Sequence, residues 1–415
     1  MCKRLVQHLN TNDILHDNQY AYRKKRSTEL AVTKLTKFIL NGFDENKLTI
    51  GVFLDLSRAF DCVKHATLIK KLKYYGIDGI ALKWFTDYLN NRSQVVKYNN
   101  IYSDCLPVNA GVPQGSILGP ILFLLYMNDI HNAAPNVNKL LFADDTLTFD
   151  QDVCYFELVK RINTNLEYLR KWFIANSLSI NILKTETIVF SRKIVYYPLP
   201  PIIFNCKAIP FSHNVKFLGI YLDPKLSWKI HISHVKNKIS SVCGVLNHIR
   251  GKISLKIAKM IYYAVAYSHF TYGNAIWSSA SISNLTPLVL IQKRIIRIIA
   301  RRGWIDHTLP IFKELNILTF PDICKLVTSS FVFKTLNSLL VSPIQFHHRQ
   351  NPHYNLRNLT ELVIPPHRSA QTKLFIHIRG AELWNSLPNN VRQATSYASF
   401  KRRIKTYLLS NYEER

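Results

Sequence analysis

The chain has 415 residues, enough for two or three domains, and 47% of them are hydrophobic, which excludes wholesale disorder. Its formal net charge of +28 indicates a polyanionic partner. Nucleic acid is favoured over a membrane because the cations are spread over several segments, although a basic ribosomal or chromatin protein would carry a similar charge.

The cysteines and the lengths of the apolar runs indicate in which cellular compartment the protein is found. The seven cysteines are scattered without the spacing of a zinc site or a disulfide framework, so we expect reduced thiols. The N-terminus lacks the apolar core of a signal peptide, and no apolar run reaches the roughly 18 residues that a membrane span needs. We therefore expect an intracellular protein of the cytoplasm, the nucleus or both, with no membrane partner.

The segment before the first predicted strand is basic. Residues 5–14 carry apolar side chains at helical spacing. Residues 19–28 then bring four cations around two tyrosines, and Ser27 is a plausible cap for a helix that continues to residue 39. A basic loop at a helix N-terminus suits a phosphate group, and a solvated basic turn is the alternative.

A short, almost wholly apolar run at residues 49–54 predicts a buried central strand that ends at Asp55. Helices are predicted over residues 63–75, closed by Gly76, and over residues 80–89. A pair of strands is predicted at residues 94–98 and 103–110.

A loop with two glycines, residues 111–115, follows this strand pair and leads into an apolar helix at residues 117–126. Glycine allows the backbone of such a loop to approach a ligand closely.

Two adjacent carboxylates are the centre of the next predicted element. Residues 140–149 predict a hairpin with Asp144 and Asp145 at its tip. Two acids in an apolar context are costly to bury unless a cation neutralises them, and a divalent metal ion is the natural candidate. The alternative to a metal site is a solvated turn with two exposed carboxylates. With Asp55 at the end of another buried strand, the three carboxylates could form a two-metal site for phosphoryl transfer.

The remaining chain is mainly helical and basic. Helical spacing covers residues 156–173, and strands are predicted at residues 185–190 and 215–223. Residues 224–305 contain no acidic residue, so we expect a helical domain that contacts a duplex backbone, with a membrane-lying helix as the alternative. A Pro/His-rich patch in the final segment carries His347, His348 and His353 without companion ligands, which argues against a metal site there.

Several of these stretches resemble reverse transcriptases of non-LTR (LINE-like, jockey-type) retrotransposons. Residues 142–145 resemble the FADD box, residues 53–61 motif A and residues 111–120 motif B, in the family's order. Residues 19–28 resemble the fingers arginine motif, residues 176–185 motif D and residues 215–223 motif E, the primer grip.

The resemblance implies an α+β right-hand polymerase with an antiparallel-sheet palm, partial fingers and an all-helical thumb. The activity it implies is that of an RNA-directed DNA polymerase acting on an RNA template, a DNA primer and dNTP. Residues 1–223 would form the partial fingers and palm, and residues 224–340 would form the basic thumb. Residues 341–415 would form a C-terminal tail region of unknown role.

The resemblance also implies roles for individual residues. Asp55, Asp144 and Asp145 would hold two Mg²⁺, with Mn²⁺ as a substitute. Lys184 would lie near the leaving pyrophosphate as a general acid, or it is an ordinary surface lysine. Phe60, five positions after Asp55, would exclude a 2′-hydroxyl, or it is an ordinary core residue.

The other implied contacts are to nucleotide, template and primer. The nucleotide contacts would be made by Arg23, Gln114 and Gly115. The template and primer contacts would be made by Gly111, Pro113, Phe217, Leu218 and Gly219.

The family's upstream fingers segment and endonuclease are not in this sequence, so we expect an N-terminally truncated copy. A catalytically inactive relic that only binds nucleic acid is the rival hypothesis.

Overall fold

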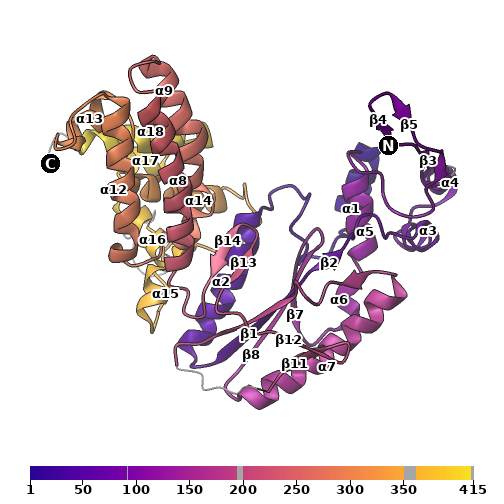
Figure 1. The fold of residues 1–415 in the computed structure, drawn as a ribbon. Coiled ribbons are helices and arrows are strands. Elements are labelled where there is room, and N and C mark those ends of the chain that lie inside the picture. Colours follow the sequence, from indigo (N-terminus) through magenta and orange to yellow (C-terminus); the bar gives the residue numbers. More distant parts are fainter. Residues whose placement is uncertain (91, 194–199, 350–360, 413–415) are drawn as a thin grey trace. The chain divides into compact units, whose positions relative to one another are not determined.

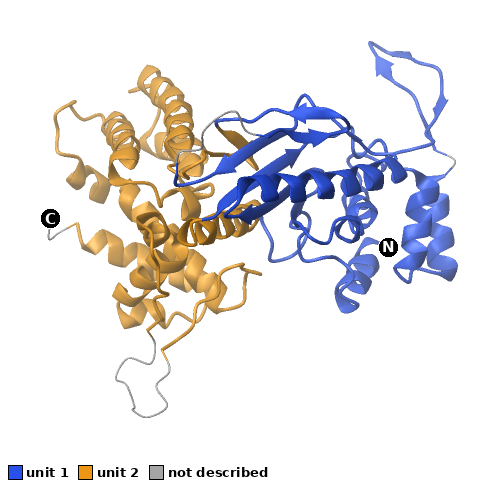
Figure 2. Ribbon diagram, turned by 90° about the horizontal axis from the view of Figure 1, so that it is seen from below, with its two compact units in different colours: residues 1–27, 47–213 blue, residues 28–46, 214–415 orange. Residues whose placement is uncertain are grey.

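The computed structural model describes residues 1–90, 92–193, 200–349 and 361–412. Two compact units make up the chain (Figure 2). The first contains residues 1–27 and 47–213, and the second contains residues 28–46 and 214–415.

The first unit is built on an antiparallel sheet of four strands in the order β10, β1, β8, β7. Figure 1 labels β1, β7 and β8 of this sheet. These strands are β1 (Leu48–Leu54), β7 (Asn138–Phe142), β8 (Asp145–Asp152) and β10 (Glu186–Phe190). Every residue of β1 after Leu48 is buried, because β1 has a partner on each side. This burial explains why its sequence is continuously apolar and does not alternate.

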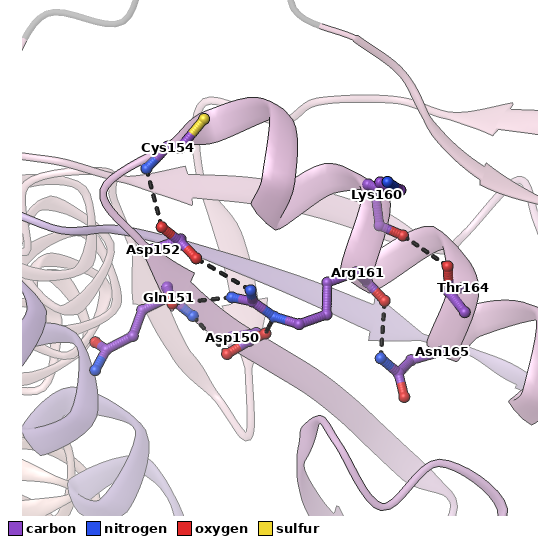
Figure 3. A network of polar contacts seen from close by, with 8 residues as sticks. All are labelled: Asp150, Gln151, Asp152, Cys154, Lys160, Arg161, Thr164 and Asn165. Carbon is purple, nitrogen blue, oxygen red and sulfur yellow. Dashed lines mark hydrogen bonds and ion pairs between the residues drawn. The ribbon is translucent and has the colours of Figure 1, made fainter.

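Helix α7 (Tyr155–Ala175) packs against β8. Its buried side chains include Leu158, Ile162 and Leu166, at the predicted helical spacing. Arg161 reaches from this helix to the carboxylates of Asp150 and Asp152 on β8 (Figure 3), with its Nη1 3.0 Å from Asp152 Oδ2. The helix is thus attached to the sheet by an ion-pair network as well as by its apolar face.

The other helices of the first unit are short. They are α1 (Cys2–Thr11), α3 (His65–Tyr74), α4 (Gly79–Leu89), α5 (Gly119–Met127) and α6 (Ile130–Ala133). Helix α5 is buried over most of its circumference, which fits a sequence that is apolar on all sides.

Four small two-stranded pairs complete the first unit. They are β2 (Leu56–Ser57) with β9 (Ser179–Ile180), β3 (Ser93–Gln94) with β6 (Leu106–Pro107), β4 (Lys97–Tyr98) with β5 (Ile101–Tyr102), and β11 (Ile202–Phe204) with β12 (Lys207–Ile209).

The second unit combines helix α2 (Thr28–Asp44), the hairpin β13 (Val215–Phe217) and β14 (Ile220–Leu222), and a group of later helices. From residue 224 to residue 340, all of it described, the regular elements are helical. They are α8 (Lys229–His248), α9 (Leu255–Ile261), the π-helix η1 (Tyr262–Tyr267), α10 (Ser268–Thr271), α11 (Asn274–Trp277), α12 (Ile282–Ile299), α13 (Thr308–Glu314) and α14 (Phe320–Leu336).

The C-terminal segment adds further helices to the same unit. They are α15 (Ala370–Leu374), α16 (Ile376–Ser386), α17 (Asn389–Arg392) and α18 (Tyr397–Ser410). Phe400 of α18 stacks on Phe333 of α14 with ring centroids 4.5 Å apart, and Trp384 of α16 stacks on Phe400 at 5.8 Å. These contacts join residues 376–410 to the helices that precede them.

The predicted α+β class is confirmed, and so is the helical character of residues 224–340. The division of the chain differs from the predicted boundaries at 223 and 340. The compact units separate after residue 213, α2 belongs with the later helices, and the C-terminal helices are part of the second unit. The cause is tertiary packing, which helical periodicity alone does not reveal. In the described ranges, no helix is both long and apolar enough to cross a membrane.

Candidate active site

Strand register brings two of the predicted acids together. In the β1–β8 pair, Leu54 lies opposite Thr146. One further step along both strands places Asp55 opposite Asp145, and residues opposite each other in an antiparallel pair project from the same face. The Asp55 backbone is also held from the other side, because its N–H donates to Thr185 Oγ1 at 3.3 Å and its C=O accepts from Asn181 N–H at 2.8 Å.

Asp144 lies in the turn that joins the hairpin. Phe142 pairs with Asp145, so the turn itself consists of Ala143 and Asp144. Ala143 has a φ of 56°, in the left-handed region that a residue with a Cβ rarely adopts. Its N–H donates to Oε1 of Gln19 at 3.2 Å, and this bond helps to hold the strained turn.

The three acids influence one another electrostatically. Burial is the largest cause that raises the pKa of Asp145, the negative charges of Asp144 and then Asp55 add to it, and together they bring this pKa to about 6. Asp145 is nevertheless exposed to solvent on one side. Its pKa rises because many protein atoms surround the carboxylate on the other sides. Such a raised pKa is expected where like charges gather without a compensating cation.

The acids fit a divalent cation by their chemistry. Hard cations prefer carboxylate oxygens, and among the residues described none of these three carboxylates has a cationic partner. Within the same residues, however, no three His, Cys, Asp or Glu side chains stand close enough together to hold an ion as they are. The backbone therefore brings the three acids to one end of the sheet, but their carboxylate groups are not yet close enough together to coordinate one ion.

Phe60 and the predicted nucleotide loop are close to one another. The Phe60 ring stacks on Phe123 of α5, with centroids 4.2 Å apart, and the Phe60 C=O accepts from Val112 N–H at 2.9 Å. Gly111 has a φ of 92°, and a Cβ there would lie 3.1 Å from the Cα of Asp61. Only glycine therefore allows this loop to lie against the loop that follows Asp55.

The loop is held by side chains as well. Nε2 of Gln114 donates to Oδ1 of Asp61 at 2.7 Å. The buried His65 contacts the C=O of Gly111 through its Nε2 at 2.7 Å, so this histidine helps to fix the position of the loop. Pro113 and Gly115 complete the loop, and a Cβ on Gly115 would meet open space.

Arg23 is committed to the backbone of its own segment. Its Nη1 donates to the C=O of His16 at 2.7 Å and to the C=O of Gln19 at 3.4 Å. Burial, followed by the charge of Arg26, lowers the pKa of Arg23. The guanidinium therefore shapes the basic loop, and its remaining N–H groups would have to make any contact with phosphate.

Lys184 is exposed and lies on the turn that supports Asp55. Its N–H donates to the C=O of Asn181 at 3.2 Å, and the N–H of Asn181 is bonded to Asp55. The predicted motif D is thus attached to motif A through the backbone.

The predicted primer-grip residues form the tip of the β13–β14 hairpin in the second unit. Phe217 ends β13, and Leu218 and Gly219 form the turn with positive φ values of 46° and 79°. The hydroxyl of Tyr272 donates to the Leu218 C=O at 2.7 Å. Within this unit the turn is therefore anchored to the helices and does not hang free.

Sequence reasoning did not single out Gln19 and Thr185. Gln19 is 2% exposed, and its Oε1 accepts from the N–H groups of Ala21 and Ala143. Thr185 is fully buried beneath Asp55. Both lie beside recognisable motifs, but their partners are too far away in the sequence for local patterns to reveal them.

The carboxylate pair, the glycine loop and the antiparallel sheet together define a polymerase of the reverse-transcriptase class. Residues 1–222, just over half of the chain, match the family described as reverse transcriptase (RNA-dependent DNA polymerase), so the chain belongs to this family. The sheet is accordingly the palm of a right-hand polymerase, as predicted.

The curated relatives come from non-LTR retrotransposons, as the motifs predicted. The chain is 28% identical over 348 residues to the probable RNA-directed DNA polymerase from transposon BS of Drosophila melanogaster, covering 80% of this chain and 38% of that protein. It is 26% identical over 336 residues to that of the X-element (77% and 36%) and 25% identical over 309 residues to that of jockey (72% and 33%), both from the same fly. The chain thus spans between 33% and 38% of the length of these relatives.

Among solved structures, the chain is similar to apo telomerase from Candida tropicalis. The sequence identity is 12%, the match covers 82% of this chain and 58% of that one, and the TM-score is 0.39.

Proposed function

We propose that this chain carries the polymerase activity of a non-LTR retrotransposon protein: template-directed transfer of nucleotides from dNTP to the 3′-hydroxyl of a DNA primer on an RNA template. The observation that supports this most directly is the register of β1 and β8: Leu54 lies opposite Thr146, so Asp55 and Asp145 are the next residues along the two strands, and Asp144 lies in the adjoining turn. Family membership supports the same activity.

Each residue of the candidate site would have its own role in nucleotide transfer. Asp55, Asp144 and Asp145 would hold two Mg²⁺, or Mn²⁺ in their place, and the ions when bound would activate the primer oxygen and stabilise the leaving pyrophosphate. Phe60 would lie under the sugar, and Lys184 would donate a proton to the pyrophosphate.

The remaining contacts would position the substrates. Gln114 and Gly115 would contact the incoming nucleotide, with Arg23 near its triphosphate. Gly111 and Pro113 would contact the template. The hairpin tip at Phe217, Leu218 and Gly219 would contact the primer.

Primer extension tests the proposal. The full chain should extend oligo(dT) on poly(rA) in the presence of Mg²⁺ and dTTP, and chelation with EDTA should stop the reaction. The double substitution Asp144→Asn with Asp145→Asn should abolish extension, by about a thousandfold or more, because charge stabilisation of the transferred group is the main catalytic contribution. Incorporation that survives this change would refute the catalytic assignment.

A matched control uses another carboxylate of the same unit. Glu157, in the first turn of α7, is exposed and is not one of the proposed ligands. Glu157→Gln removes a negative charge just as the catalytic substitutions do, and it should leave extension unchanged. The rival proposal, a relic that only binds nucleic acid, predicts hybrid binding without extension in the unsubstituted chain.

A further inference from the structure

Helix α4 presents a ladder of flat side chains that the proposed chemistry does not use. The rings of Trp84 and Tyr88 stack with centroids 5.3 Å apart and planes 9° from parallel. Beyond them, the guanidinium of Arg92 lies over the Tyr88 ring, 5.6 Å from its centroid. Trp84 and Tyr88 are four positions apart, so they follow one another along a single face of α4, and Arg92 reaches Tyr88 from beyond the end of this helix at Leu89. Trp84 is 39% exposed, which leaves part of the outermost ring open to solvent.

The inner end of this ladder opens into a cavity. Arg92 lines a mainly polar cavity of about 530 Å³ together with Ser93 and Gln94 at the foot of the β3–β6 pair. The opposite wall is the loop from Ala110 to Gln114, with Asp61 beside it. All of these residues belong to the first unit. A volume of several hundred Å³ is typical of a ligand site, and the polar lining of this cavity suits a polar ligand.

The strands next to the cavity expose a second set of aromatic side chains. Tyr98 on β4 and Tyr102 on β5 are 74% and 60% exposed, and Nζ of Lys97 lies 5.1 Å from the centroid of the Tyr102 ring. Figure 1 draws this hairpin and α4 at the same end of the unit. Cations that alternate with open aromatic faces are characteristic of proteins that bind single-stranded nucleic acid, because every base offers a π face and every phosphate a charge.

We propose that the Trp84–Tyr88–Arg92 ladder and the adjoining cavity bind the unpaired 5′ part of the template RNA, upstream of the base being copied. This inference rests on the proposed function, because it takes the Gly111–Gln114 loop as the place where the template is read. A single strand is required, since bases inside a duplex have no free faces for Trp84. The cavity receives the nucleotides next to the templating base, and the ladder receives those further along.

The test compares two hybrids by fluorescence anisotropy, a measurement that requires no turnover. One is a blunt-ended RNA–DNA hybrid, and the other carries a 5′ RNA overhang of about ten nucleotides, within the range that such surfaces cover. The full chain should bind the second hybrid about tenfold more tightly. Trp84→Leu, which keeps apolar bulk but removes the ring, should abolish this gain and leave the affinity for the blunt hybrid unchanged.

Two further variants complete the comparison. Trp84→Phe keeps an aromatic face and should retain most of the gain. Tyr168→Ala removes a ring of similar exposure, 47%, from α7 of the same unit and should retain all of it.

The inference is overturned if the overhang adds nothing in the unsubstituted chain, which would indicate that this surface docks a protein or another ligand. It is overturned as well if the gain survives Trp84→Leu and Arg92→Ala together, or if Trp84→Leu weakens both hybrids equally. Failure of primer extension alone would count against the proposed function, whereas these binding results test the ladder separately.

Discussion

The side chain of Gln19 and the backbone of Ala143 are joined by a hydrogen bond of 3.2 Å, although 124 positions separate them in the chain. Through this bond the basic loop near the N-terminus supports the turn that carries Asp144. The same Oε1 accepts the N–H of Ala21 at 3.0 Å, so one buried oxygen holds two segments.

Gln19→Leu should therefore destabilise the first unit and reduce primer extension together. The substitution leaves two buried N–H groups without an acceptor, and each costs roughly 1–3 kcal/mol. Urea unfolding should show a loss of about 2–4 kcal/mol. Gln7→Leu, at an exposed position of α1 in the same unit, should change stability by less than about 0.5 kcal/mol. Equal stability of the Gln19 variant and the parent chain would show that this bond is dispensable.

Asp145→Asn should stabilise the metal-free protein at neutral pH. Burial and the neighbouring acids raise the pKa of Asp145 to about 6 from 3.8, so stability falls as the pH rises through this window and stays low above it. Full conversion of the shift would give about 3 kcal/mol, but Asp145 is exposed and solvent screening reduces the expected gain to about 1 kcal/mol.

Thermal unfolding in EDTA should show this gain for Asp145→Asn at pH 7 and none near pH 3.5. Addition of Mg²⁺ should then stabilise the parent chain more than the variant, because the variant lacks one proposed ligand. A variant that is less stable than its parent at pH 7 in EDTA would contradict the electrostatic account of the three acids.

His231 should make the second unit sensitive to acid. This side chain is 2% exposed, and burial, followed by the charge of His234, lowers its pKa to about 4. The unfolded chain takes up the proton at about pH 6.5, so the contribution to stability is complete above that pH and is lost as the pH falls towards 4. The loss should reach about 3 kcal/mol.

His231→Asn provides the comparison. The Asn side-chain oxygen can replace Nδ1 of His231, which accepts the N–H of Tyr221 at 3.4 Å, but it does not titrate. Urea unfolding at a series of pH values should show a smaller slope between pH 4 and pH 6.5 for the variant. Identical slopes would mean that other groups cause the acid sensitivity.

Gly111→Ala should impair both stability and extension. The positive φ and the backbone of Asp61 leave no room for a Cβ, so the loop has to move, at a cost of roughly 1–3 kcal/mol. Gly244→Ala in α8 is the matched control, because a Cβ there meets nothing within 4 Å. The control should be neutral or more stable by up to about 1 kcal/mol. A fully active Gly111→Ala chain would show that the loop tolerates displacement.

Phe60→Val should lower discrimination against ribonucleotides. The ring is held by its stack on Phe123, and a smaller side chain at this position would leave space for a 2′-hydroxyl. The ratio of kcat/KM for dTTP and UTP should fall by at least about tenfold, with dTTP incorporation retained. An unchanged ratio would remove Phe60 from the role of sugar gate and leave it as a core residue.

The sequence predicted those elements best whose local pattern of apolar residues is caused directly by their burial in the structure. The apolar runs before Asp55 and on both sides of Asp144 and Asp145 follow directly from the burial of β1, β7 and β8. Helix α2 was predicted as a helix, yet its place in the second unit depends on partners beyond residue 213. Gln19 escaped attention for the same reason, because a buried polar partner far along the chain leaves no periodic signal.

The discontinuous make-up of the second unit has a consequence for synthesis on the ribosome. Helix α2 leaves the exit tunnel almost 170 residues before the rest of its unit begins at residue 214. At roughly 5–20 residues per second, its apolar side chains, Leu35 and Ile39 among them, wait on the order of ten seconds or more for their final neighbours. During that interval a chaperone or a temporary contact has to shield them, and the nascent chain is most exposed to aggregation.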